Sequence, residues 1–169
     1  MKEKMKRTSC LLFALALLVS LSAAPVRTEQ VCKPIVGVFE AVVVPPGQGH
    51  CPADPGAFCT AGRVRGGLHG DYQFVMSAAF PSDSLGGVPT ILFFVGNSDM
   101  TLKTGDHVLG VDTGSIDLPP GKGGFASLIT FSGGTGAMAS TTGQIRLRGE
   151  FNAQESTTSG DYIGTICTP

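Results

Sequence analysis

The sequence lacks the patterns by which several common classes of protein are recognised. It has no tryptophan, no CxxC pair and no N-glycosylation sequon. It also has no GxSxG nucleophile elbow and no GxxxxGK[ST] phosphate loop, which excludes these two catalytic designs. Beyond the N-terminal region no long run of apolar residues has helical spacing. Helix is therefore at most a minor component of the fold.

Charge is also scarce, since charged residues make up only 15% of the chain. Without the first 23 residues, eight basic residues remain against twelve acidic ones, a net charge of −4. Nucleic acid is a poor partner for such a chain. Arg63/Arg65 and Arg146/Arg148 are the close basic pairs, and a spacing of two places each pair on one face of a strand. This is typical of a solvated outer face.

The N-terminus has the pattern of an export signal. Four basic residues and one acidic residue precede an uncharged apolar run from Cys10 to Leu21, which is followed by small residues up to Ala24. The run is about half of the roughly 20 residues that a membrane-spanning helix needs. We therefore expect a signal peptide over residues 1–23, cleaved after Ala23, and a single domain over 24–169. The protein should be secreted, either extracellular or periplasmic, with no membrane anchor after cleavage.

Four cysteines remain after cleavage: Cys32, Cys51, Cys59 and Cys167. An even count in an exported chain predicts two disulfides, for which three pairings exist. Cys51 and Cys59 flank a turn-rich loop, whereas Cys32 and Cys167 lie at the two ends of the domain and should adjoin if the sheet closes. The alternative is a metal site formed by His50, Cys51, Cys59 and His69. We favour disulfides, and no metal, because His50 and Cys51 are adjacent and the compartment is oxidising.

The rest of the chain consists of short apolar or alternating runs separated by glycine, proline, asparagine or aspartate, which predicts eight or nine strands. In residues 143–151, polar side chains alternate with Ile145, Leu147 and Phe151, so one face of that strand should be wet. Several of the 24 glycines must lie within strands, where they permit the strong coiling of a small barrel. The runs are 34–44, 59–67, 71–80, 90–96, 99–105, 107–114, 124–131, 143–151 and 160–167.

Residues 133–147 read GGTGAMASTTGQIRL, after a strand that ends near Phe131. This segment resembles the GGTG or GGSG turn, small-residue bend and following strand of plant allene oxide cyclases and dirigent proteins, and the likeness extends back to about Tyr72. The resemblance implies an all-β, antiparallel, eight-stranded calycin-like barrel. It also implies an apolar interior that holds a hydrophobic substrate and steers cyclisation or radical coupling mainly by shape. Bacterial relatives are similar in being short, exported and rich in glycine.

We expect this interior to bind a small hydrophobic molecule without a cofactor. The expected lining residues are Phe74, Met76, Phe93, Phe94 and Phe131. Residues 91–95 are apolar on both faces, which predicts cover from outside by a long loop, by another segment, or by a second copy in a homo-oligomer. A barrel filled by its own side chains, with no catalytic role, is the alternative.

Glu40 is the candidate catalytic residue. Phe39-Glu40 and Pro45 match the glutamate and proline positions on the first strand of allene oxide cyclases, whereas Val42 stands where that family has asparagine. Inside an apolar barrel the pKa of this carboxylate would be raised, and it could exchange a proton with a substrate. Both faces of this strand are apolar, so the sequence leaves the orientation of Glu40 open.

A different class of function is indicated by Val111-Asp112-Thr113-Gly114-Ser115, the short signature of aspartic proteases, in which two aspartates activate water. A homodimer could supply both aspartates. Asp-Thr-Gly is also a common turn composition, and we expect Asp112 to lie on a hairpin turn.

Overall fold

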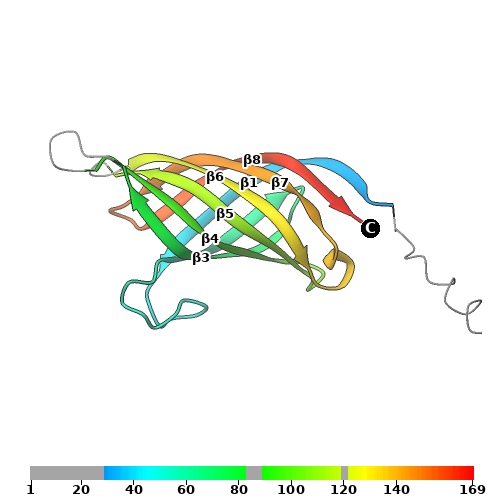
Figure 1. Cartoon of the computed structure of the whole chain (residues 1–169), viewed down its shortest axis with the longest axis horizontal. Helices are drawn as coiled ribbons and strands as arrows, with labels where there is room; N and C mark the ends of the chain where they lie inside the picture. The colour runs from blue at the N-terminus through cyan, green and yellow to red at the C-terminus, as the bar shows by residue number, and fades with distance from the viewer. Residues whose placement is uncertain (1–28, 83–88, 119–121) are drawn as a thin grey trace, which may run out of the picture.

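The structure, a computed structural model, describes residues 29–82, 89–118 and 122–169. Eight antiparallel strands form a closed barrel, in which each strand pairs with the next and the last pairs with the first (Figure 1). The strands are β1 (Val31–Val44), β2 (Cys59–Gly66), β3 (Gly70–Pro81), β4 (Ile91–Leu102), β5 (His107–Asp117), β6 (Lys122–Gly134), β7 (Thr142–Asn152) and β8 (Thr157–Thr168). The predicted fold class is confirmed. The expected signal peptide lies outside the described residues.

Nine runs in the sequence become eight strands because two of them, 90–96 and 99–105, belong largely to β4. Asn97 and Ser98 have turn-like composition, but Ser98 faces the interior and is buried. Gly96 does not end a strand either. A Cβ atom there would lie 2.4 Å from the ring of Phe74, so glycine makes room for that ring within the barrel.

Two disulfides hold the barrel, Cys32–Cys167 and Cys51–Cys59. Cys32 and Cys167 are direct partners in the register between β1 and β8, so the bridge lies across the seam where the barrel closes. The predicted pairing is confirmed. The second bridge closes the loop that precedes β2. Both bridges indicate an oxidising, extracellular-type environment.

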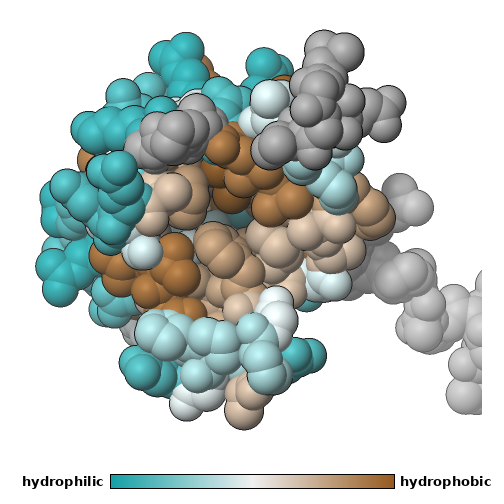
Figure 2. All heavy atoms as spheres, turned by 90° about the vertical axis from the view of Figure 1, so that its left-hand side faces the viewer, coloured by the Kyte–Doolittle hydropathy of each residue, from teal (hydrophilic) through white to brown (hydrophobic). Residues whose placement is uncertain are grey.

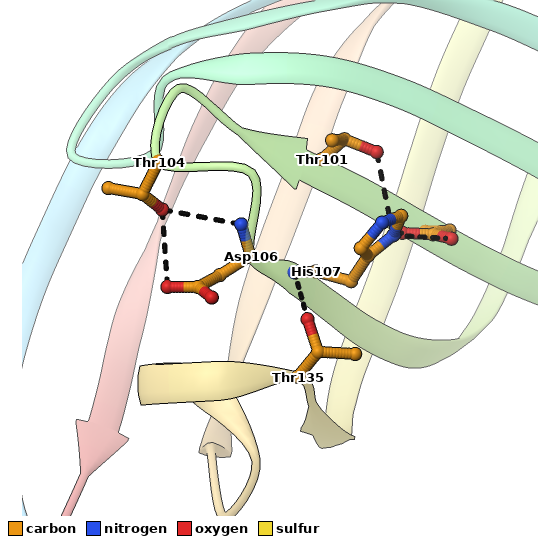
Figure 3. A network of polar contacts seen from close by, with 6 residues as sticks. Thr101, Thr104, Asp106, His107 and Thr135 are labelled. Carbon is orange, nitrogen blue, oxygen red and sulfur yellow. Dashed lines mark hydrogen bonds and ion pairs between the residues drawn. The ribbon is translucent and has the colours of Figure 1, made fainter.

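One end of the barrel, which we call the closed end, is sealed by side chains and turns. Tyr162 Oη accepts a hydrogen bond from the Leu68 N–H (2.8 Å) and donates one to the Leu68 carbonyl (3.1 Å), and both residues are buried. The GGTG turn lies here too, followed by the short 3-10 helix η1 (Gly136–Met138). The His107 N–H donates to Thr135 Oγ1 at 2.8 Å (Figure 3). The motif is therefore a structural turn that joins β5 to the β6–β7 connection.

Candidate functional site

The opposite end, which we call the mouth, is where β1–β2, β3–β4, β5–β6 and β7–β8 connect. Figure 2 looks onto this end and shows apolar side chains around a hollow. The cavity inside has a volume of about 20 Å³. This is close to the room that one water molecule needs. Its lining consists of Phe39, Phe58, Thr60, Tyr72, Phe74, Met76, Phe94, Asp112, Ile116, Phe125, Leu147, Phe151 and Thr158.

Aromatic rings fill most of the space at the mouth. Phe74, Phe94 and Phe125 form a chain of contacts with centroid separations of 5.4 and 6.2 Å. Phe39 lies 5.6 Å from Phe125. These are ordinary separations for packed aromatic pairs. Phe58 and Phe151, both only partly buried, meet edge to face at 6.4 Å. Phe58 directly precedes β2 and Phe151 lies on β7, and these two strands flank the β1–β8 pair. Their contact therefore spans part of the mouth.

Beneath these rings, four neighbouring strands each place one polar side chain inside the barrel: Tyr72 on β3, Ser98 on β4, Asp112 on β5 and Ser127 on β6. Ser98 Oγ donates to Asp112 Oδ2 at 3.0 Å, and Tyr72 Oη donates to the same oxygen at 3.2 Å. Tyr72 Oη and Ser98 Oγ lie 3.3 Å apart. We call these four residues the acid cluster.

Two polar atoms of the acid cluster make no hydrogen bond within the described part of the chain, although the Ser127 hydroxyl lies near enough to Asp112 to lower the pKa of its carboxyl group. Asp112 is only 1% exposed, yet its Oδ1 makes no hydrogen bond to the described residues, and neither does Ser127 Oγ. A buried polar group left unpaired costs about 1–3 kcal/mol, and a charged one costs more. The cluster therefore carries an energetic penalty that an apolar side chain in place of Asp112 would remove.

Burial raises the pKa of Asp112, and the hydroxyls of Ser127, Ser98 and Tyr72 oppose that shift in part. The pKa of Tyr72 is raised well above its usual value, first by burial and then by the negative charge of Asp112. Tyr72 therefore stays protonated and donates its hydrogen bond at any ordinary pH. Chemically, the cluster can accept a hydrogen bond at Asp112 Oδ1, or hold a proton there, inside an apolar chamber.

The structure gathers three of the five expected lining residues in this chamber, namely Phe74, Met76 and Phe94. Phe131 is buried in the core but does not line the cavity. The placement of Phe93 in the interior was wrong. Phe93 is 48% exposed on the outer face, because neighbouring residues in a strand point to opposite sides and Phe94 takes the inner position. Cover of Phe93 by a second copy stays a prediction.

Glu40 also requires a correction. Its carboxylate lies on the outer face of β1 and pairs with Arg65 of β2 at 2.6 Å, with both side chains about half exposed. The inward residues of β1 are its neighbours Phe39 and Ala41, which are buried. A solvated, ion-paired carboxylate outside the barrel cannot reach a substrate inside it, so the catalytic role expected for Glu40 is wrong.

The expected turn at Asp112 is wrong as well. The protease-like signature lies in the middle of β5, which runs without interruption from His107 to Asp117. Gly114 serves packing here, because a Cβ atom would lie 2.5 Å from the ring of Phe94. The barrel wall separates Asp112 from the surface, so a second copy cannot bring another aspartate to it. The two-aspartate protease arrangement is therefore excluded.

The residues considered as metal ligands do not gather into a metal site among the described residues. Cys51 and Cys59 are bonded to each other, so the alternative in which they bind a metal with His50 and His69 is wrong. His107, which Figure 3 shows near the closed end, pairs with Asp99 at 2.8 Å. Within residues 29–82, 89–118 and 122–169, no three histidine, cysteine or acidic side chains gather as a metal site. In the same ranges no helix is long and apolar enough to cross a bilayer.

Sequence reasoning missed the acid cluster, although the signal was present. In residues 107–117 every second position, from Val108 to Ile116, is apolar or glycine except Asp112. That alternation predicts an inward carboxylate, but the turn-like composition of Asp-Thr-Gly outweighed it. Tyr72 and Ser98 could not be linked to Asp112 without the register of β3, β4 and β5.

The barrel agrees with the architecture implied by the resemblance to allene oxide cyclases and dirigent proteins. Architecture does not identify that family, because one barrel fold carries many functions. Comparison of the chain with protein-family models, with curated proteins and with solved structures finds no match.

Proposed function

We propose that this protein is a secreted barrel that binds one small, mainly apolar molecule through its mouth. Asp112 receives a polar group of that molecule. The observation that carries the proposal is the unpaired Asp112 Oδ1 within an apolar, aromatic chamber. A barrel with a purely structural role would be more stable with an apolar residue at this position, whereas a binding site needs a polar group to orient its ligand.

The ligand must displace side chains, because the cavity of about 20 Å³ holds little more than one water-sized group. Phe58, Met76, Phe125 and Phe151 are only partly buried and pack at the edge of the core. Their movement costs less than disruption of the fully buried residues below them. Opening of the Phe58–Phe151 contact therefore precedes entry, and a small polar head group takes the existing space.

Export is part of the proposal. The basic and apolar N-terminal pattern and the two disulfides support a route to an oxidising compartment. Any cyclisation or stereocontrol of the kind implied by the family resemblance would require an acid or base inside the chamber. That role falls to Asp112, the buried carboxyl group of the described residues, and not to Glu40.

The experiment is a titration of the disulfide-bonded protein with an apolar fluorescent probe, followed by displacement with small aryl alcohols. We expect saturable binding by the unmodified protein, with an affinity that changes in Phe125→Ala, where loss of an inner ring alters both the contacts and the free volume of the chamber. Phe93→Ala, which removes an outer ring, is the matched control and should bind as the unmodified protein does. Equal probe binding by both variants would place the site outside the barrel, and absence of saturable binding would remove the proposed function.

A second candidate is a barrel filled by its own side chains, with a structural or interaction role. The small cavity favours it. The same titration separates the two candidates, because a filled barrel gives no saturable probe binding by the unmodified protein, and binding that appears only in Phe125→Ala would mark a cavity made by the substitution.

A further inference from the structure

We propose that the polar group received by Asp112 is a protonated amine, so that the barrel takes small primary amines with an apolar body. The inference rests on the proposed function and names its ligand class. It follows from which atoms of the acid cluster are free, from the charge inside the barrel and from the rings that surround the cluster.

Two atoms of the cluster are free among the described residues: Asp112 Oδ1, which only accepts when the carboxyl group is ionised, and the Ser127 hydroxyl, which can accept and donate. The hydroxyls of Ser98 and Tyr72 donate to Oδ2, and the Ser127 hydroxyl, although near enough to lower the pKa of Asp112, makes no hydrogen bond to these residues, which leaves Oδ1 as an acceptor without a donor. Ser127 Oγ is also buried and without a partner. An ammonium group offers up to three N–H donors and can serve both oxygens at once, whereas an alcohol offers a single O–H donor.

The charge inside the barrel is not compensated by the protein. Among the described residues no lysine, arginine or histidine is buried. The five ion pairs of the described ranges all join side chains that are at least 37% exposed. A buried carboxylate without a countercharge is costly, and a ligand cation removes that cost. Since folding has already taken Asp112 out of water, binding has only to desolvate the ammonium group.

The surroundings suit a cation with an apolar body. Phe94 and Phe125 line the cavity together with Asp112. Aromatic rings attract ammonium groups through their faces, a contribution of about 0.5–1 kcal/mol at exposed sites and more where water is excluded. An ammonium head is similar in size to the water-sized space already present. Its aryl or alkyl body would take the place of Phe58 and Phe151 at the mouth.

The experiment compares 2-phenylethylamine, 2-phenylethanol and ethylbenzene, which differ in the head group alone, by displacement of the bound probe at pH 8. We expect the amine to bind at least about tenfold more tightly than the alcohol. In Asp112→Asn the ratio of the amine affinity to the alcohol affinity should fall below about threefold. Phe93→Ala is the control that keeps the preference.

Equal affinities for amine and alcohol, or an amine preference that survives in Asp112→Asn, would overturn the inference and leave the proposed function standing. Failure of all three compounds to displace the probe would count against the proposed function itself.

The unmodified protein provides a second readout that does not depend on the variant. Amine affinity should rise with pH as Asp112 loses its proton, whereas alcohol affinity should not. Tyr72 is the other titratable group that faces Asp112, and β4 and β6 contribute only Ser98 and Ser127. A flat profile for the amine would contradict the inference.

Discussion

Replacement of Asp112 by asparagine should make the barrel less sensitive to alkaline pH. The amide keeps the shape of the carboxyl group, and its oxygen can still accept from Ser98 and Tyr72. Its NH2 group gains a donor that Ser127 Oγ can accept. The variant therefore loses the charge and retains the packing.

The size and sign of the effect follow from the raised pKa of Asp112. Between the unfolded pKa and the raised folded pKa, the folded state binds more protons than the unfolded state, so stability falls as pH rises. The loss reaches about 1.4 kcal/mol for each pH unit that separates the two pKa values. Below the unfolded pKa both states are protonated and the contribution of Asp112 is fully favourable. Above the pKa of Asp112 in the folded state this favourable contribution is fully lost. Because the Asp112→Asn side chain does not titrate, the free energy of unfolding of the variant should there equal or exceed that of the unmodified protein.

The assay is urea denaturation of both proteins, with disulfides intact, from pH 3.5 to pH 8.5. The difference in unfolding free energy between variant and unmodified protein should grow in favour of the variant with rising pH and then level off. A variant that is less stable by more than about 1 kcal/mol at every pH would refute the reasoning. That result would mean that Asp112 is an ordinary ionised group with a full set of partners.

Three further tests, with five substitutions in all, examine the placement of individual side chains by urea denaturation. Cys32→Ser should cost about 5 kcal/mol or less, and more than Cys51→Ser, because it opens the longer loop; the opposite order would contradict the role of the seam bridge. Phe94→Ala should cost about 3–5 kcal/mol and Phe93→Ala less than about 1 kcal/mol, since only Phe94 is buried; similar costs would show that the strand faces are misassigned. Glu40→Gln should cost under about 1 kcal/mol and leave probe binding unchanged, because it breaks only a surface ion pair; loss of binding would return Glu40 to the site.

The sequence predicts the fold where the two faces of a strand differ in polarity. In β7, Arg146 and Arg148 face outward while Ile145 and Leu147 are buried, as the alternation indicates. The closing bridge was also predictable, because a barrel must bring its first and last strands together.

The candidate site was not predictable to the same extent, and the reason is physical. Alternation assigns a face only when one set of residues is polar. In β1 the outward residues Val36, Val38 and Val42 are as apolar as the inward ones, so Glu40 could not be oriented. The same ambiguity affects Phe93 and Phe94. Only the pairing register joins the members of the acid cluster, and register depends on the whole barrel.

The proposed function requires a ligand to enter the mouth and reach the acid cluster. Methyl NMR of the methionine side chains tests it directly, because Met76 lines the cavity at the mouth whereas Met138 lies on η1 at the closed end. On addition of 2-phenylethanol or 2-phenylethylamine, the Met76 methyl signal should shift with saturation while the Met138 signal stays in place. A Met76 signal that does not move at saturating concentrations, or a shift confined to Met138, would contradict the account.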